Sequence, residues 1–132
     1  MDTINWLETL GWTDEHLDDI RNVGYAYIRQ GKYETALPFF EALVVLDPSS
    51  SYDLQTLGGI YLEMDQIESA IDYFNKALEV DQDDSGSILL NLAKAYFISG
   101  NIEEGMQIAS TLNNHANLYV ASQSTALVLA YS

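Results

Sequence analysis

A repeat with a period of 34 residues constrains the fold of this chain more than any other feature of its sequence. Residues 24–27 read GYAY, and residues 58–61, 34 positions later, read GGIY. A third copy follows after one inserted residue. The other positions in register are Ile20, Val23, Ala36 and Phe40, then Leu54, Leu57, Ala70 and Phe74, then Leu89, Leu92, Ala93, Tyr96, Gly105 and Ala109. Such a period is typical of repeat architectures, in which each unit buries its apolar face against its neighbours.

Each unit is predicted to be a pair of antiparallel helices, because the apolar residues recur at the spacing of one helix face. Gly24 and Gly58 let a second helix approach closely, and Phe40 and Phe74 then fill the space one turn further along. In the third copy Gly105 and Ala109 replace the alanine and the phenylalanine of the first two, so we expect looser packing there. Helices are predicted near residues 3–10, 14–30, 34–46, 52–64, 68–80, 86–98, 102–112 and 118–131, with no strand.

The pattern resembles the tetratricopeptide repeat, which pairs Trp/Leu-Gly-Tyr on one helix with Ala-Phe and a late Pro on the next. Pro48 supplies that proline in the first copy, and Gln82 replaces it in the second. The resemblance implies an all-α fold, a right-handed superhelix of about three helix pairs. We expect one domain over 1–132. Its parts are an N-terminal helix (1–13), repeats at 17–50, 51–84 and 86–118, the last degenerate, and an apolar C-terminal helix (118–131).

The charge of the chain excludes several classes of partner. The 132 residues include 20 Asp and Glu against 5 Lys and Arg, a formal net charge of −15. Such a chain is repelled by phosphate backbones and anionic lipids, so we expect no nucleic-acid and no membrane partner. There is no cysteine, which excludes disulfides and thiolate metal sites. The first residues lack the pattern of a signal peptide, and we expect a soluble cytoplasmic protein.

Signals for catalysis are weak. The two histidines, His16 and His115, lie in distant repeats, the first at a helix start and the second among loop asparagines, where we expect it to be solvated. No nucleophile–base pair or phosphate loop is present. Residues 81–86 begin like a calcium loop but lack its final carboxylate, because Leu92 stands there. The sequence therefore predicts no enzyme, no metal and no cofactor.

A concave groove is expected along the first helix of each pair, where residues that do not face the second helix are exposed. Many of them are apolar, so the groove would take up apolar side chains of a protein or peptide partner. The predicted peptide-binding residues are Arg21, Tyr25, Ile28, Tyr52, Leu62, Leu90, Lys94, Phe97 and Ile98. Two alternatives are that some of these belong to the core, or that the N-terminal helix covers them with Trp6 and Trp12 as a plug.

Residues 27–47 carry the run GKYE-x-A…F-x-AL…LD and resemble the tetratricopeptide-type chaperones of bacterial type III secretion. The resemblance implies a cytoplasmic chaperone that holds a translocator or needle subunit before export and shields its apolar segments. The competing hypothesis is an adaptor inside an intracellular multiprotein complex. Related repeats hold heat-shock chaperone tails with Lys, Arg and Asn. The equivalent residues here are Arg21, Tyr25, Thr56, Ser87 and Asn91. Arg21 is the cationic residue of this set. That co-chaperone role is therefore not expected.

The C-terminal end of the chain carries no charge, since every Asp, Glu, Lys and Arg lies at or before Glu104. A terminal repeat helix normally presents a polar outer face. We therefore expect this end to contact another chain, in a homodimer or heterodimer through the termini. The alternative is a natural chain that continues past residue 132. The predicted assembly interface consists of Leu118, Val120, Leu127, Leu129 and Tyr131.

Overall fold

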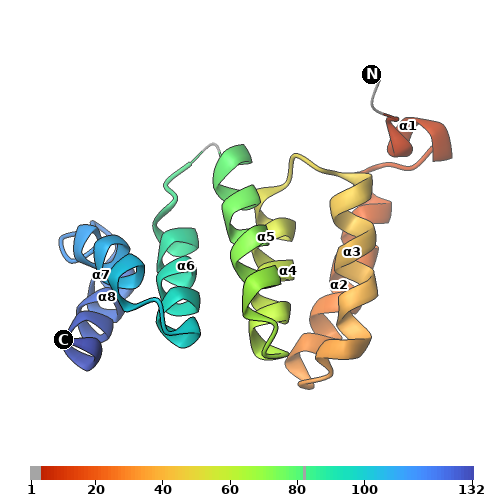
Figure 1. The fold of residues 1–132 in the computed structure, drawn as a ribbon. Coiled ribbons are helices and arrows are strands. Elements are labelled where there is room, and N and C mark those ends of the chain that lie inside the picture. The colour runs from red at the N-terminus through yellow and green to blue at the C-terminus, as the bar shows by residue number, and fades with distance from the viewer. Residues whose placement is uncertain (1–3, 82) are drawn as a thin grey trace.

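The computed structural model describes residues 4–81 and 83–132, which form a superhelical row of eight helices and no strand (Figure 1). Residue 3, expected in the first helix, and Gln82 lie outside the described residues. The helices are α1 (Trp6–Leu10), α2 (Asp14–Arg29), α3 (Tyr33–Leu46), α4 (Ser51–Glu63), α5 (Ile67–Val80), α6 (Gly86–Ser99), α7 (Ile102–Thr111) and α8 (Leu118–Tyr131). The predicted all-α fold is confirmed, and from the second helix onward the predicted helix ends lie within about two residues of those observed.

Local capping explains where several helices begin and end. The Ser50 hydroxyl accepts a hydrogen bond from the Asp53 backbone N–H at the start of α4, as N-cap serines do. At the other end, Gly31, Asp65 and Gly100 follow α2, α4 and α6 with φ of 73°, 61° and 88°. This left-handed conformation suits glycine and costs an aspartate free energy. The same turn position therefore closes the first helix of every pair.

Close contact between paired helices depends on two glycines. A Cβ atom added to Gly24 would lie 2.6 Å from Cε2 of Phe40, and one added to Gly58 would lie 2.7 Å from the ring of Phe74. Both phenylalanine rings are completely buried. The glycine on one helix and the aromatic ring on the next thus form the core of the first two pairs, as the sequence predicts.

The third pair reaches the same packing by a different route, and the expected looser packing is wrong. Gly105 lies on the second helix of this pair, and a Cβ there would be 2.8 Å from the ring of Phe97, which comes from the first helix. Ala93 and Ala109 are fully buried beside that ring. The aromatic side chain and the small residue have exchanged helices, so the space is filled.

The two ends of the row differ in how they are attached. Helix α8 packs on both α6 and α7, as the first helix of a further repeat would. Helix α1 contacts α3 and lies at the end of the row, beside the start of α2 (Figure 1). Among the described residues, no helix is both long and apolar enough to cross a bilayer.

Candidate peptide-binding site

The inner face of the row contains a hollow of about 360 Å³ between α2, α4 and α6. Its floor is formed by Gly59, where an added Cβ would meet nothing within 4 Å. Two of the predicted peptide-binding residues, Tyr25 and Ile28, are part of its wall. The full lining is Tyr25, Ile28, Tyr33, Gln55, Thr56, Gly59, Ile60, Glu63 and Asn91. The missing side chain at Gly59 leaves room for a side chain of a ligand.

Tyr25 is held rigidly in that wall. Its hydroxyl lies 3.1 Å from Oγ1 of Thr56 on the neighbouring α4. Its ring packs edge-on against Phe40, with 5.1 Å between centroids. A wall residue fixed by both a hydrogen bond and an aromatic contact loses little further freedom when a ligand binds. The groove is therefore preformed at this point.

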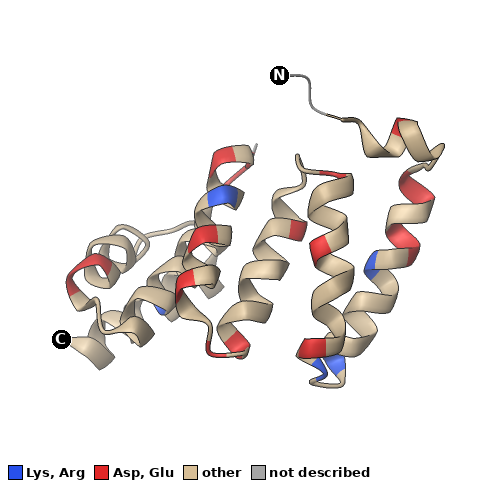
Figure 2. Cartoon of the chain, turned by 45° about the vertical axis from the view of Figure 1, so that its right-hand side comes forward, with Lys and Arg blue, Asp and Glu red and all other residues tan. Residues whose placement is uncertain are grey.

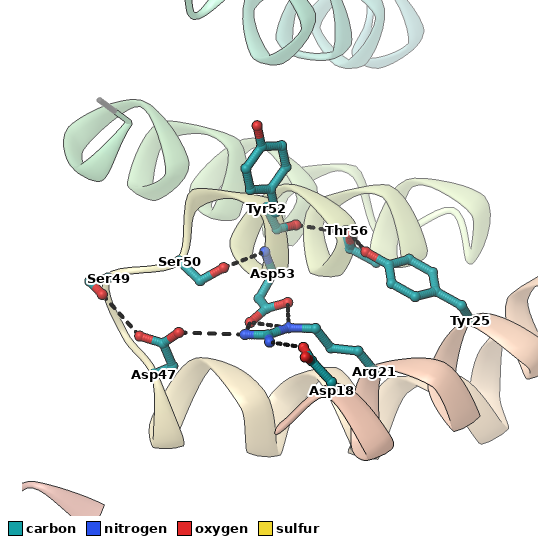
Figure 3. A network of polar contacts seen from close by, with 9 residues as sticks. All are labelled: Asp18, Arg21, Tyr25, Asp47, Ser49, Ser50, Tyr52, Asp53 and Thr56. Carbon is teal, nitrogen blue, oxygen red and sulfur yellow. Dashed lines mark hydrogen bonds and ion pairs between the residues drawn. The ribbon is translucent and has the colours of Figure 1, made fainter. Parts of the chain in front are cut away.

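Arg21, also predicted to bind peptide, is instead fully engaged inside the protein (Figure 3). Its Nε and Nη2 donate to the Asp53 carboxylate at 2.9 and 2.7 Å. Nη1 donates to Asp18 at 3.0 Å, and Nη2 also reaches Asp47 at 3.4 Å. The hydrogen bonds that it donates to Asp53 raise the pKa of the guanidinium above its ordinary value, against the effect of partial burial. Arg21 joins α2 to α4, so its assignment as a ligand-binding residue is corrected.

A second hollow, of about 470 Å³, lies at the far end of the groove. It brings together four predicted residues: Leu62, Lys94, Phe97 and Ile98. Helix α8 contributes Leu127 and Tyr131 to the same lining. The Tyr131 ring stacks on Phe97 with 4.3 Å between centroids. Phe97 is only 3% exposed, so it forms the base of the hollow, whereas Ile98 is more than half exposed at its edge.

The structure does not place Leu90 and Tyr52 with the other predicted residues. Leu90 is 2% exposed and packs against Leu112 and Val120, because the loop after α7 and the start of α8 cover that face of α6. Its assignment to the groove is wrong. Tyr52 is 70% exposed and outside both hollows, and in Figure 3 its ring points away from the Arg21 network.

The alternative in which the N-terminal helix covers the groove is also wrong. Trp6 and Leu7 of α1 face Leu46 and Pro48 at the far end of α3, where they line a separate hollow. Trp12 stacks on His16, with 5.6 Å between ring centroids. Neither tryptophan lines the groove hollows, because α1 is attached to the second helix of the first pair.

The uncharged C-terminal helix is covered on one side only. Val120 is 3% exposed in a cluster with Leu90 and Leu112, so its assignment to an assembly surface is corrected. Leu127 is half-buried against the core of the third pair. Leu118 and Leu129 are 83% and 72% exposed, and Tyr131 is 40% exposed. The role of these three exposed residues in contacting another chain stays a prediction.

Sequence reasoning missed a contact between two loops. Nε2 of His115 lies 2.7 Å from the Asp84 carboxylate, and Nδ1 accepts a hydrogen bond from the Asn117 backbone N–H. A proton on Nε2 satisfies both contacts in the neutral ring. The hydrogen bond from His115 lowers the pKa of Asp84. His115 is therefore packed between loops, not solvated, and no local pattern reveals this because Asp84 is 31 residues away.

Solved structures with the same fold include bacterial secretion chaperones. The Yersinia enterocolitica type III secretion chaperone SycD, in complex with a peptide of the translocator YopD, superposes with a TM-score of 0.82 at 21% identity over 90% of this chain and 94% of that chain. PcrH in complex with the chaperone-binding region of PopD gives 0.77 at 18% over 92% and 94%. The second repeat domain of human RPAP3, in complex with an HSP70 peptide, gives 0.74 at 18% over 85% and 91%. At these identities the comparisons show that the fold is shared.

Comparison at the level of sequence identifies the family. The human and mouse proteins named cell division cycle protein 16 homolog are each 31% identical over 71 residues, which is 54% of this chain and 12% of theirs. This chain thus matches a small part of those relatives. The family model described as anaphase-promoting complex, cyclosome, subunit 3 matches residues 29–108, more than half of the chain. The chain therefore belongs to this tetratricopeptide-repeat family.

Proposed function

We propose that this chain is a non-enzymatic chaperone that holds an apolar segment of a type III secretion export substrate in its groove before export. The substrate would be a translocator or needle subunit, and binding would take place in the cytoplasm. The observation that carries the proposal is the preformed hollow above Gly59, walled by Tyr25 and Ile28. Concave, mostly apolar sites with a few polar groups are typical of peptide recognition.

The mechanism is competition with aggregation. A ligand that binds only one form of its partner draws the population towards that form by mass action. A groove that holds an apolar segment in this way lowers the concentration of free aggregation-prone subunit. Tyr25, Ile28 and Leu62 would supply the apolar contacts, while Gln55 and Asn91 would satisfy backbone groups of the segment.

The fold comparisons support the bacterial form of this proposal. Two of the neighbours described above, SycD and PcrH, were solved with segments of translocators, and the match extends over at least 90% of this chain. The comparisons therefore support the class of partner, and the identity of the held segment is part of the proposal.

Co-expression with candidate export substrates tests the proposal. Each needle and translocator subunit of the host is produced with the wild-type chain, with Tyr25→Ala plus Leu62→Ala, or with the control Val23→Ala plus Val45→Ala. The control removes two exposed apolar side chains outside the hollows. We expect one subunit to stay soluble with the wild type and the control and to precipitate with the groove variant. Equal solubility with both double variants would contradict the groove assignment.

A second candidate function is an adaptor in a larger complex, and the family match favours it. The matching family is described by a subunit of a multiprotein complex, and the relatives that match in sequence are named for the cell division cycle. An adaptor holds a folded, permanent partner. Hydrogen exchange on the bound partner separates the two, because a chaperoned segment exchanges rapidly outside the contact and a folded partner is protected throughout.

A further inference from the structure

Glu63 occupies an unusual place in the groove, because three hollows meet at it. It lines the hollow above Gly59 and the hollow formed with Lys94 and Ile98. It also lines a third hollow, of about 540 Å³, beside the turn between α2 and α3. It is the residue that these three linings have in common. A ligand that runs along the inner face would therefore pass this carboxylate.

The carboxylate of Glu63 has no evident role in stabilising the fold. Glu63 is the last residue of α4, and a negative charge at a helix C-terminus is disfavoured by the helix dipole. Among residues 4–81 and 83–132, no hydrogen bond or ion pair of its side chain is observed. Two positions later Asp65 adopts φ of 61°, where the equivalent turns have glycine. Departures from local preference of this kind are expected at functional positions.

Each of the three hollows has an excess of one negative charge. Among the described residues that line the hollow above Gly59, Glu63 is the only Asp, Glu, Lys or Arg. Beside the α2–α3 turn, the hollow is lined by Lys32 together with Glu34 and Glu63. At the far end, the hollow is lined by Lys94 together with Glu63 and Asp65. In Figure 2 the acidic residues recur along most helices, and the basic residues are few. With Arg21 engaged by three carboxylates, the groove offers little to an acidic ligand.

We propose that the groove selects a peptide segment in which a Lys or Arg lies within two residues of an apolar anchor, with the anchor over Gly59 and the cation at Glu63. Gly59 and Glu63 are one helical turn apart on α4, so their sites are about 6 Å apart, the span of two residues in an extended peptide. The stem of the basic side chain packs along Ile28 and Tyr33 while its head stays at the carboxylate. This inference rests on the proposed function and names its ligand class.

A random peptide library displayed on phage tests the inference. It is selected on the wild-type chain, on Glu63→Gln and on the matched control Glu79→Gln. Glu79 is an exposed glutamate in the last turn of α5 and lines none of the three hollows. We expect the wild type and the control to enrich peptides with a Lys or Arg within two residues of an apolar position. Glu63→Gln keeps the apolar preference and loses the basic one.

Titration with one enriched synthetic peptide measures how much the Glu63 carboxylate contributes to affinity. We expect Glu63→Gln to bind it about fivefold more weakly than the wild type at low salt, and the difference to shrink as ionic strength rises. Replacing the basic residue of the peptide by alanine should remove the difference. Glu79→Gln should bind as the wild type does. Circular dichroism confirms that both variants are folded.

The outcomes separate this inference from the function on which it rests. Enrichment of apolar peptides without a basic residue, or of the same basic peptides on Glu63→Gln, overturns the inference and leaves the groove assignment in place. Enrichment of no apolar peptide on the wild type overturns both.

Discussion

The guanidinium of Arg21 and the carboxylate of Asp53 form a two-pronged ion pair that ties α2 to α4, with contacts of 2.9 and 2.7 Å (Figure 3). The Asp53 side chain is 1% exposed and the Arg21 side chain 21%. This contact and the Tyr25–Thr56 hydrogen bond join the first helices of two successive repeats. They therefore fix the relative position of the helices that form the groove.

Removing the cation from this pair should destabilise the protein strongly. Arg21→Met leaves the Asp53 carboxylate buried without its partner, and we expect the free energy of unfolding to fall by about 3 kcal/mol. Urea denaturation followed by circular dichroism measures it. Asp18→Ala, which removes an exposed member of the network, should cost about 0.5 kcal/mol.

The double variant Arg21→Met plus Asp53→Leu is the control for the ion pair. Replacing both partners by apolar side chains removes the uncompensated charge, so part of the lost stability should return. Unchanged stability in Arg21→Met would show that the pair does not hold the two repeats together.

Two adjacent glycines should respond to alanine in opposite directions. A Cβ at Gly58 would lie 2.7 Å from the Phe74 ring, so Gly58→Ala should destabilise by about 2 kcal/mol. A Cβ at Gly59 meets nothing within 4 Å, so Gly59→Ala should stabilise the helix by about 0.5–1 kcal/mol. Thermal unfolding of the two variants side by side measures both effects. Equal melting temperatures would contradict the helix packing described here.

Acidification should weaken the link between the two loops at Asp84 and His115. The hydrogen bond from His115 lowers the pKa of Asp84 below its ordinary value of 3.8. The ionised carboxylate is therefore favoured by the folded state. Its contribution to stability is complete above about pH 5 and is lost as the pH falls through the lowered pKa.

A comparison of variants isolates this effect from the other carboxylates. The stability difference between the wild type and Asp84→Asn should shrink as the pH falls from about 5 through the lowered pKa of Asp84. Asp83→Asn, which removes a charge one position away, is the control. A difference for Asp84→Asn that stays constant over the whole range would contradict the assigned contact.

The exposed side of α8 should govern association with another chain. Leu118 and Leu129 are exposed, so Leu118→Ser plus Leu129→Ser should leave the fold intact while removing apolar surface. We expect light scattering to give a higher mass for the wild type than for this variant at the same concentration. A monomeric wild type at high concentration, with no partner bound, would count against self-association.

The sequence predicts the part of the fold that depends on the repeat. Gly24 and Phe40 recur at fixed spacing, so the helix pairs and their packing follow from the period alone. The exchange of roles between Phe97 and Gly105 does not follow, because the ring and the small residue keep the fit while leaving the pattern. Periodicity therefore specifies the packing of the copies that keep the pattern, and not that of the copy that departs from it.

The candidate site is less predictable, because it depends on contacts between repeats. Tyr25 and Ile28 were found because their register on the first helix places them on the inner face. Arg21 shares that register, but its partner Asp53 comes from the next repeat, 32 residues away. Leu90 also has the expected register, and α8 covers it. Which inner-face residues stay accessible depends on packing between neighbours, which the sequence pattern does not contain.

Filling the hollow above Gly59 shows whether an apolar side chain of the partner binds there. The wild type, Gly59→Ala and Gly59→Leu are titrated with a synthetic segment of the export subunit that the wild type keeps soluble, and their melting temperatures are measured in parallel. A leucine side chain enters open space in the groove, so the fold should persist. We expect binding at least about tenfold weaker for Gly59→Leu than for Gly59→Ala, at undiminished melting temperature. Equal affinity of the two folded variants would contradict it.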